Sequence, residues 1–204
     1  MASRLLFLVR HGEQDRPEVE SPDAGLSARG RRQATLLGER LRGVPFSAVH
    51  HGPARRAAET AELVAAALPG VPVYVSELAG DHLPHDTDPA GLPPAYASFL
   101  AGFTERERAD GPRRTPEAVA RFATAPTDGD VRDLVITHNF LIAWFVRHAL
   151  EAPERRWLGL NHHNCGLTVI RYRDGGPPNL IAVNDVSHLP LELRGTGLPP
   201  DYVF

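Results

Sequence analysis

The chain has 204 residues, a formal net charge of -3 at pH 7 and a single cysteine, Cys165. This length can hold one sizeable hydrophobic core, so we expect residues 1–204 to form a single domain. One cysteine excludes an intramolecular disulfide, and we expect Cys165 to be structural. The acidic balance gives no reason to expect a nucleic-acid partner.

All 22 cationic side chains other than histidine are arginines. The lack of lysine excludes a lysine Schiff base and a P-loop, which removes two large classes of carbonyl and phosphate chemistry. No apolar run approaches the roughly 20 residues needed to span a bilayer, and the N-terminus lacks the pattern of a secretory signal. We therefore expect a cytoplasmic protein with no membrane partner.

The first predicted element is a buried strand over residues 5–9, which ends in Arg10, His11 and Gly12. Open α/β sheets place their chemistry at the carboxyl ends of strands. A guanidinium clamps phosphate through paired hydrogen bonds, a neutral imidazole can attack phosphorus, and glycine lets the backbone pass close to a ligand. The tripeptide therefore favours phosphate chemistry, with the alternative that Arg10 and His11 simply follow a buried strand.

Two helices and two short strands are expected next. Ser27 is placed to cap a helix whose apolar residues recur at helical spacing. A short strand over residues 47–50 precedes a second helix, in which Pro53 suits the first position. Residues 71–75 form a further strand candidate. Residues 81–94 are rich in proline, aspartate and histidine, and a loop of this length is usually functional.

Helices are expected near residues 95–108 and 116–123, where the spacing of Phe99 and Phe103 favours core packing over a pocket wall. A strand over residues 131–137, a helix over 140–150, and a closing pair of strands over 167–172 and 180–183 follow. Strands that alternate with helices predict an α/β fold, a three-layer α/β/α sandwich with a mostly parallel central sheet.

Four segments, residues 5–12, 25–34, 51–61 and 134–139, together resemble the histidine phosphatase superfamily, the phosphoglycerate mutase-like proteins of branch 1. They occur in the family's order, and the likeness extends to residues 184–189. The resemblance implies a phosphoglycerate mutase-like fold. It also implies a phosphate pocket made by Arg10, His11, Arg56 and His138, in which His11 becomes phosphorylated.

The sequence supports His138 separately, because it ends a predicted strand directly before a helix. Unpaired N–H groups and the helix dipole attract an anion there, and the N–H of Asn139 could add to the pocket. The adjacent pairs at residues 50–51 and 162–163 cannot both face one way on a strand. We expect most of those four histidines to be surface or supporting residues. His188 is a weaker pocket candidate.

Hydrolysis needs a proton donor for the leaving oxygen and then a base for water. The resemblance implies a carboxylate about twenty residues after the Thr60-Ala61 pair, which indicates Asp81 in preference to Glu77. It also places Gln14 at a phosphate-pocket position where the family usually has a hydroxyl residue, and Pro17 where it has an asparagine. These two departures favour a phosphatase over a mutase.

The sequence therefore predicts a histidine acid phosphatase-type phosphomonoesterase, which hydrolyses small-molecule phosphoesters through a phosphohistidine on His11. Because cationic side chains neutralise the phosphate charge, we expect no metal and no other cofactor. The alternatives are a phosphoglycerate mutase-type phosphotransferase, a catalytically silent phosphate-binding member, and a metallohydrolase that uses the histidines. The last lacks any His-Glu-x-x-His spacing. The physiological substrate and the oligomeric state stay open.

Overall fold

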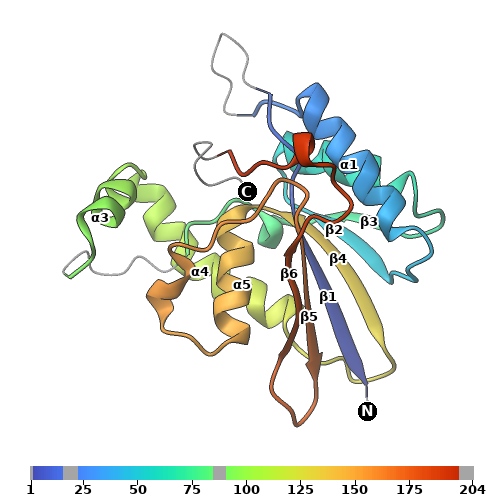
Figure 1. The fold of residues 1–204 in the computed structure, drawn as a ribbon. Coiled ribbons are helices and arrows are strands. Elements are labelled where there is room, and N and C mark those ends of the chain that lie inside the picture. The colour runs from blue at the N-terminus through green and yellow to red at the C-terminus, as the bar shows by residue number, and fades with distance from the viewer. Residues whose placement is uncertain (1, 16–22, 85–90, 198–204) are drawn as a thin grey trace.

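A computed structural model describes residues 2–15, 23–84 and 91–197 (Figure 1). Its centre is a six-stranded sheet with the strand order β3-β2-β4-β1-β5-β6. Neighbouring strands from β3 to β1 pair in parallel, whereas β5 pairs antiparallel with both β1 and β6. The strands are β1 Ser3–Arg10, β2 Ala48–His51, β3 Val73–Val75, β4 Val131–Thr137, β5 Leu167–Arg173 and β6 Asn179–Asp185.

Helices cover both faces of this sheet. On one face lie α1 (Ala28–Leu41) and α2 (Arg55–Ala65), and on the other lie α4 (Glu105–Phe122) and α5 (Asn139–Ala149), as Figure 1 shows. The alternation of side chains along a strand sends Leu8 into the α4–α5 core and its neighbour Val9 into the α1–α2 core. The three-layer α/β/α sandwich predicted from the sequence is confirmed.

The strand register brings the candidate residues to one edge of the sheet. In the parallel pairing of β1 with β4, Arg10 lies opposite Thr137. His11 and His138 therefore follow the carboxyl ends of adjacent strands, and the His11 N–H donates to the Thr137 carbonyl at 2.9 Å. Strand β2 ends at the same edge, because His51 lies opposite Ile136.

The predicted cap of α1 is confirmed, whereas the predicted start of α2 is wrong. The Ser27 hydroxyl accepts the Gly30 N–H at 3.0 Å. Helix α2 begins at Arg55, two residues after Pro53, with Ala54 as the cap residue. Its Arg55 N–H donates to the Asp23 carboxylate at 2.9 Å. A side chain remote in the sequence thus satisfies this helix end, and local pattern does not reveal it.

The two helices predicted over residues 95–108 and 116–123 are also wrong in their division. Helix α3 (Pro94–Ala101) ends early, and α4 runs unbroken from Glu105 through its two internal prolines. Thr104 and Glu107 form a capping box that starts α4. Gly111 packs so closely on the Leu83 backbone that a Cβ there would collide with it. This contact holds α4 against the segment that follows Asp81.

The predicted loop over residues 81–94 is only partly visible. Residues 81–84 and 91–93 have no regular secondary structure, and residues 85–90 lie outside the described part of the chain. Across the described residues, none of the helices combines the length and apolar character that a membrane span requires.

Candidate functional site

His11 lies at the end of β1 with 7% of its surface exposed. Its Nδ1 is 2.7 Å from the Gly12 carbonyl oxygen, and because a carbonyl only accepts, Nδ1 carries the proton. The lone pair is then on Nε2, which accepts the Arg56 Nε–H at 3.2 Å. Burial, followed by the charges of His138 and Arg10, holds the pKa of His11 well below 6.5. The imidazole is therefore neutral at physiological pH.

The backbone around His11 is fixed by three contacts. The Gly12 N–H donates to the Thr60 hydroxyl at 3.0 Å, and that hydroxyl donates to the Arg56 carbonyl at 2.7 Å. The Asn164 amide donates to the His11 carbonyl at 3.0 Å. A Cβ on Gly12 would lie 2.6 Å from the carbonyl oxygen of Gly30, so only glycine allows α1 to approach this closely.

Arg56, in the first turn of α2, joins the candidate residues. Besides its bond to His11, it donates from Nη2 to the Asp81 carboxylate at 3.0 Å, and the same nitrogen lies 3.3 Å from Nδ1 of His138. The Asp81 oxygen is also 3.4 Å from His138 Nδ1. Arg56 is 12% exposed and Asp81 is 46% exposed, so the carboxylate faces solvent and the guanidinium lies beneath it.

His138 is almost completely buried, at 1% exposure, and occupies the cap position at the start of α5. Its ring centroid lies 4.9 Å from that of His11. Burial, together with the charges of Arg56 and Arg10, holds the pKa of His138 well below 6.5. Among the described residues its Nε2 has no hydrogen-bond partner. The ring is thus neutral, with Nδ1 beside Arg56 and Nε2 unpaired, at a helix N-terminus of the kind that attracts anions.

Arg10 is held by backbone oxygens. Its Nη1 donates to the carbonyls of His162 and Thr196, each at 2.6 Å, while its Nε is buried and unpaired within the described part of the chain. Burial lowers the pKa of Arg10 to about 10, against the opposing effect of Asp81. The group therefore stays cationic at neutral pH.

Asn139 and Gln14, two further predicted pocket residues, make contacts outside this cluster, and the contribution of the Asn139 N–H to the pocket stays a prediction. The Asn139 side chain accepts the His162 N–H at 2.8 Å and donates to the Leu160 carbonyl at 3.2 Å, so it holds a loop. Gln14 forms a β-bridge with Leu26 and is not among the described residues that line the adjacent cavity. Pro17 lies outside the described residues.

Three of the four paired histidines are buried. His50, His162 and His163 are 7%, 2% and 8% exposed, so of the two expected roles, surface or supporting, they are not surface residues. His162 is a support, because its carbonyl holds Arg10 and its Nδ1 lies 3.1 Å from Asn139 Oδ1. Burial and the nearby Arg10 lower the pKa of His162 to about 4. Sequence reasoning missed this support, because it depends on two segments that meet only in the fold.

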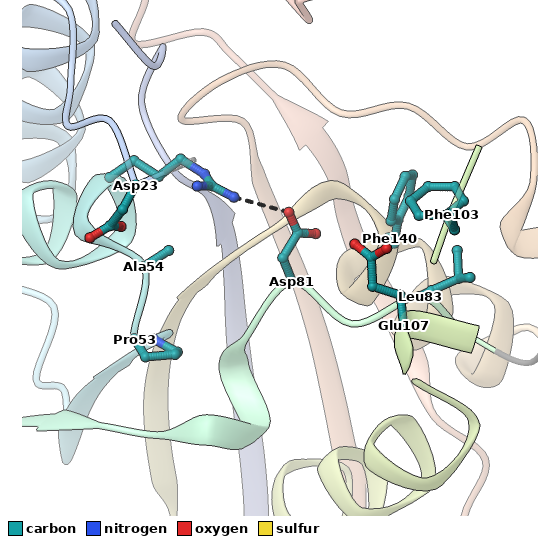
Figure 2. A pocket seen from close by; sticks show the side chains of 9 residues that line it. Asp23, Pro53, Ala54, Asp81, Leu83, Phe103, Glu107 and Phe140 are labelled. Atoms are coloured by element: carbon teal, nitrogen blue, oxygen red, sulfur yellow. Dashed lines mark hydrogen bonds and ion pairs between the residues drawn. The ribbon is translucent and has the colours of Figure 1, made fainter. Parts of the chain in front are cut away.

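A cavity of about 530 Å³ opens beside Arg56 and Asp81 (Figure 2). Phe103 lines it and also packs against the core cluster that contains Trp157, so its predicted core packing holds in part, whereas Phe99 is 41% exposed and its predicted core role is wrong. The two rings lie edge to face with their centroids 5.1 Å apart, and each also packs against Phe140. The described lining consists of Asp23, Pro53, Ala54, Arg56, Asp81, Leu83, Phe103, Glu107 and Phe140.

Glu77, the alternative carboxylate, is exposed and begins a short 3-10 turn (Glu77–Ala79) outside the described cavity lining. His188 has Asp185 as its main charged neighbour, so its surroundings differ from those of His11. Across the described residues no group of three or more histidine, cysteine, aspartate or glutamate side chains has an arrangement that could hold a metal ion.

Comparison with known proteins identifies the family. The family model of the histidine phosphatase superfamily (branch 1) matches residues 6–186. The chain belongs to the histidine phosphatase superfamily. Among solved structures, Bacillus stearothermophilus YhfR has a TM-score of 0.68 at 27% identity, with 91% of this chain and 98% of that chain covered. A mycobacterial glucosyl-3-phosphoglycerate phosphatase shares the fold, with a TM-score of 0.64 at 20% identity, over 89% and 99% of the two chains.

Curated relatives of this superfamily member include mitochondrial serine/threonine-protein phosphatases. The Pgam5 protein of Caenorhabditis briggsae is 31% identical over 193 residues, and human PGAM5 is 30% identical over 195. These matches cover 92% and 93% of this chain and 65% of each relative, so the chain spans about two thirds of their length. The expectation of a cytoplasmic protein is wrong by this comparison, because both relatives are named mitochondrial.

Lowering the pH from 7 to 5 should reduce the free energy of unfolding, because the fold keeps His11 and His138 neutral below their ordinary pKa of 6.5. The part of the free energy of unfolding that depends on these two neutral rings is fully present above pH 6.5 and is lost as the pH falls below that value. Each contributes a slope of up to about 1.4 kcal/mol per pH unit. Urea unfolding of the wild type and of the double variant His11→Asn/His138→Asn measures this, and equal slopes would contradict it.

Proposed function

We propose that this protein is a phosphatase that hydrolyses phosphomonoesters through a phosphohistidine on His11. The observation that carries the proposal is the protonation of His11: Nδ1 donates to Gly12, so the lone pair of Nε2 faces Arg56. An unprotonated imidazole nitrogen beside cationic and neutral hydrogen-bond donors fits nucleophilic attack on a phosphate dianion.

In the first step, the phosphate oxygens bind the guanidinium groups of Arg10 and Arg56 and the unpaired Nε2 of His138. The Nε2 lone pair of His11 then attacks phosphorus, and an N–P bond forms while the P–O bond to the alcohol breaks. The leaving oxygen takes a proton from the carboxyl form of Asp81, which the second step regenerates. Since a phosphate that recruits the Arg56 Nη2 takes it away from the Asp81 carboxyl, substrate binding itself frees this group for proton transfer.

In the second step, the Asp81 carboxylate accepts a proton from water, whose oxygen attacks phosphorus. The N–P bond breaks, inorganic phosphate leaves, and His11 is again neutral. The cationic side chains neutralise the charge that builds up on the phosphoryl oxygens, so the scheme is metal-independent and of the histidine acid phosphatase type.

Two observations support hydrolysis over a mutase reaction. Asp81 is 46% exposed beside the cavity, so water reaches the carboxylate that would activate it. The curated relatives are named serine/threonine-protein phosphatases. Small-molecule phosphomonoesters are the proposed substrates. Phosphorylated serine and threonine side chains are the second candidate, and the names of the relatives favour them.

Hydrolysis of p-nitrophenyl phosphate in the presence of EDTA tests the proposal. Replacement of His11 by alanine should lower turnover by at least about a thousandfold, because it removes the nucleophile. His51→Ala is the matched control, since His51 makes the same bond to its following glycine, at 2.8 Å, at the end of β2. If His11→Ala keeps turnover near that of His51→Ala, or if EDTA abolishes wild-type turnover, the proposal is wrong.

The roles of Asp81 and Glu77 can be separated with leaving groups. Asp81→Asn should lower kcat/KM for an alkyl phosphate by about 10²–10⁴-fold, because an alkoxide needs a proton as it leaves. The loss for p-nitrophenyl phosphate should be much smaller, since p-nitrophenolate leaves without one. Glu77→Gln should change neither value. Equal losses with both esters in Asp81→Asn, or an alkyl-selective loss in Glu77→Gln, would refute the assignment.

A further inference from the structure

The cavity beside Asp81 has one apolar wall. Leu83, Phe103 and Phe140 form it, and the two rings pack edge-on with their centroids 5.9 Å apart. Phe140 is in turn packed against Trp157 at 5.5 Å, which is 2% exposed. An anchored aromatic wall of this kind binds an apolar body on the alcohol side of a phosphoester.

A carboxylate faces the same cavity. Glu107, in the first turn of α4, lines the cavity with Phe103, and Figure 2 shows Asp81 between it and Asp23. The N–H and hydroxyl of Thr104 donate to Glu107 Oε2 at 2.8 and 2.6 Å. Both of these bonds end on Oε2, and the Glu107 N–H completes the capping box by donating to the Thr104 hydroxyl at 3.3 Å, so the carboxylate is fixed without using Oε1.

The charge of Glu107 is secured by the same contacts. The bonds from Thr104 lower the pKa of Glu107 below 4.5, so the group is ionised at neutral pH. The nearby cation Arg108 donates to the Phe103 carbonyl at 2.7 Å. Arg56 is the one cation among the described lining residues, and it is bonded to Asp81 and His11. The part of the cavity away from Arg56 is therefore negative.

We propose that Glu107 selects the alcohol part of the substrate, and that the preferred substrates are phosphomonoesters whose apolar body carries a cationic group such as an ammonium. This inference rests on the proposed phosphatase function. When the phosphate is bound at Arg56, the alcohol extends past Asp81 into the cavity, along the apolar wall and toward Glu107. A cation there is attracted, whereas a second anionic group is repelled by Glu107.

Three aryl phosphates test this selection: 4-(aminomethyl)phenyl, 4-(hydroxymethyl)phenyl and 4-(carboxymethyl)phenyl phosphate. They share a shape and differ in charge, and the methylene group keeps the phenol leaving groups similar. The wild type should show kcat/KM for the cationic ester at least roughly tenfold above that for the anionic ester. Added salt should reduce this ratio, because the carboxylate is exposed to solvent.

The variant Glu107→Gln removes the charge and keeps a residue that completes a capping box. It should bring the ratio of cationic to anionic kcat/KM close to one. Glu105→Gln is the matched control, because Glu105 lies in the same helical turn and is exposed but is not among the described lining residues. It should keep the wild-type ratio.

The outcomes separate the two proposals. A wild type that hydrolyses the neutral ester without any charge preference, or a preference that survives in Glu107→Gln, overturns the selection by Glu107 and leaves the phosphatase proposal standing. A wild type that hydrolyses none of the three esters overturns the phosphatase proposal instead. A charge preference that is lost in Glu107→Gln and kept in Glu105→Gln supports both.

Discussion

The burial of two neutral imidazoles against two guanidinium groups is the constraint on which the candidate site depends. His11 and His138 lie 4.9 Å apart between ring centroids, and Arg10 and Arg56 both lower the pKa of each ring. Such a pocket disfavours the protonation of either imidazole and attracts an anion. Burial and these charges together therefore keep the proposed nucleophile unprotonated, and the charges favour the binding of an anion beside it.

The fold imposes this geometry through a few backbone relations. The parallel register of β1 with β4 sets His11 and His138 at the ends of adjacent strands. Thr60 and the glycine after His11 tie α2 to the same edge, which places Arg56 across Nε2 of His11. A shift of one residue in that register would turn the two side chains to opposite faces of the sheet. The strand register that packs the sheet core therefore also places the residues of the site.

The sequence predicted the strand-end residues well, because Arg10, His11 and His138 follow long apolar runs whose burial is a strong signal. It predicted contacts between remote segments poorly. The start of α2 depends on a bond to Asp23, and the support of Arg10 depends on a carbonyl that Asn139 positions. Neither contact can be recognised from a pattern of neighbouring residues in the sequence. Phe99 was misjudged for a related reason, since α3 ends at Ala101 and the helical spacing on which its core role was inferred does not continue.

Detection of the covalent intermediate tests the central claim most directly. Wild-type protein mixed with a phosphoester and quenched in alkali within a turnover should carry up to one acid-labile phosphoryl group per chain, on the peptide that contains His11. Mass spectrometry of that peptide, before and after acid treatment, measures it. Steady turnover with no phosphoryl group on the chain, or with the group on a different residue, would contradict the account of His11 as the nucleophile.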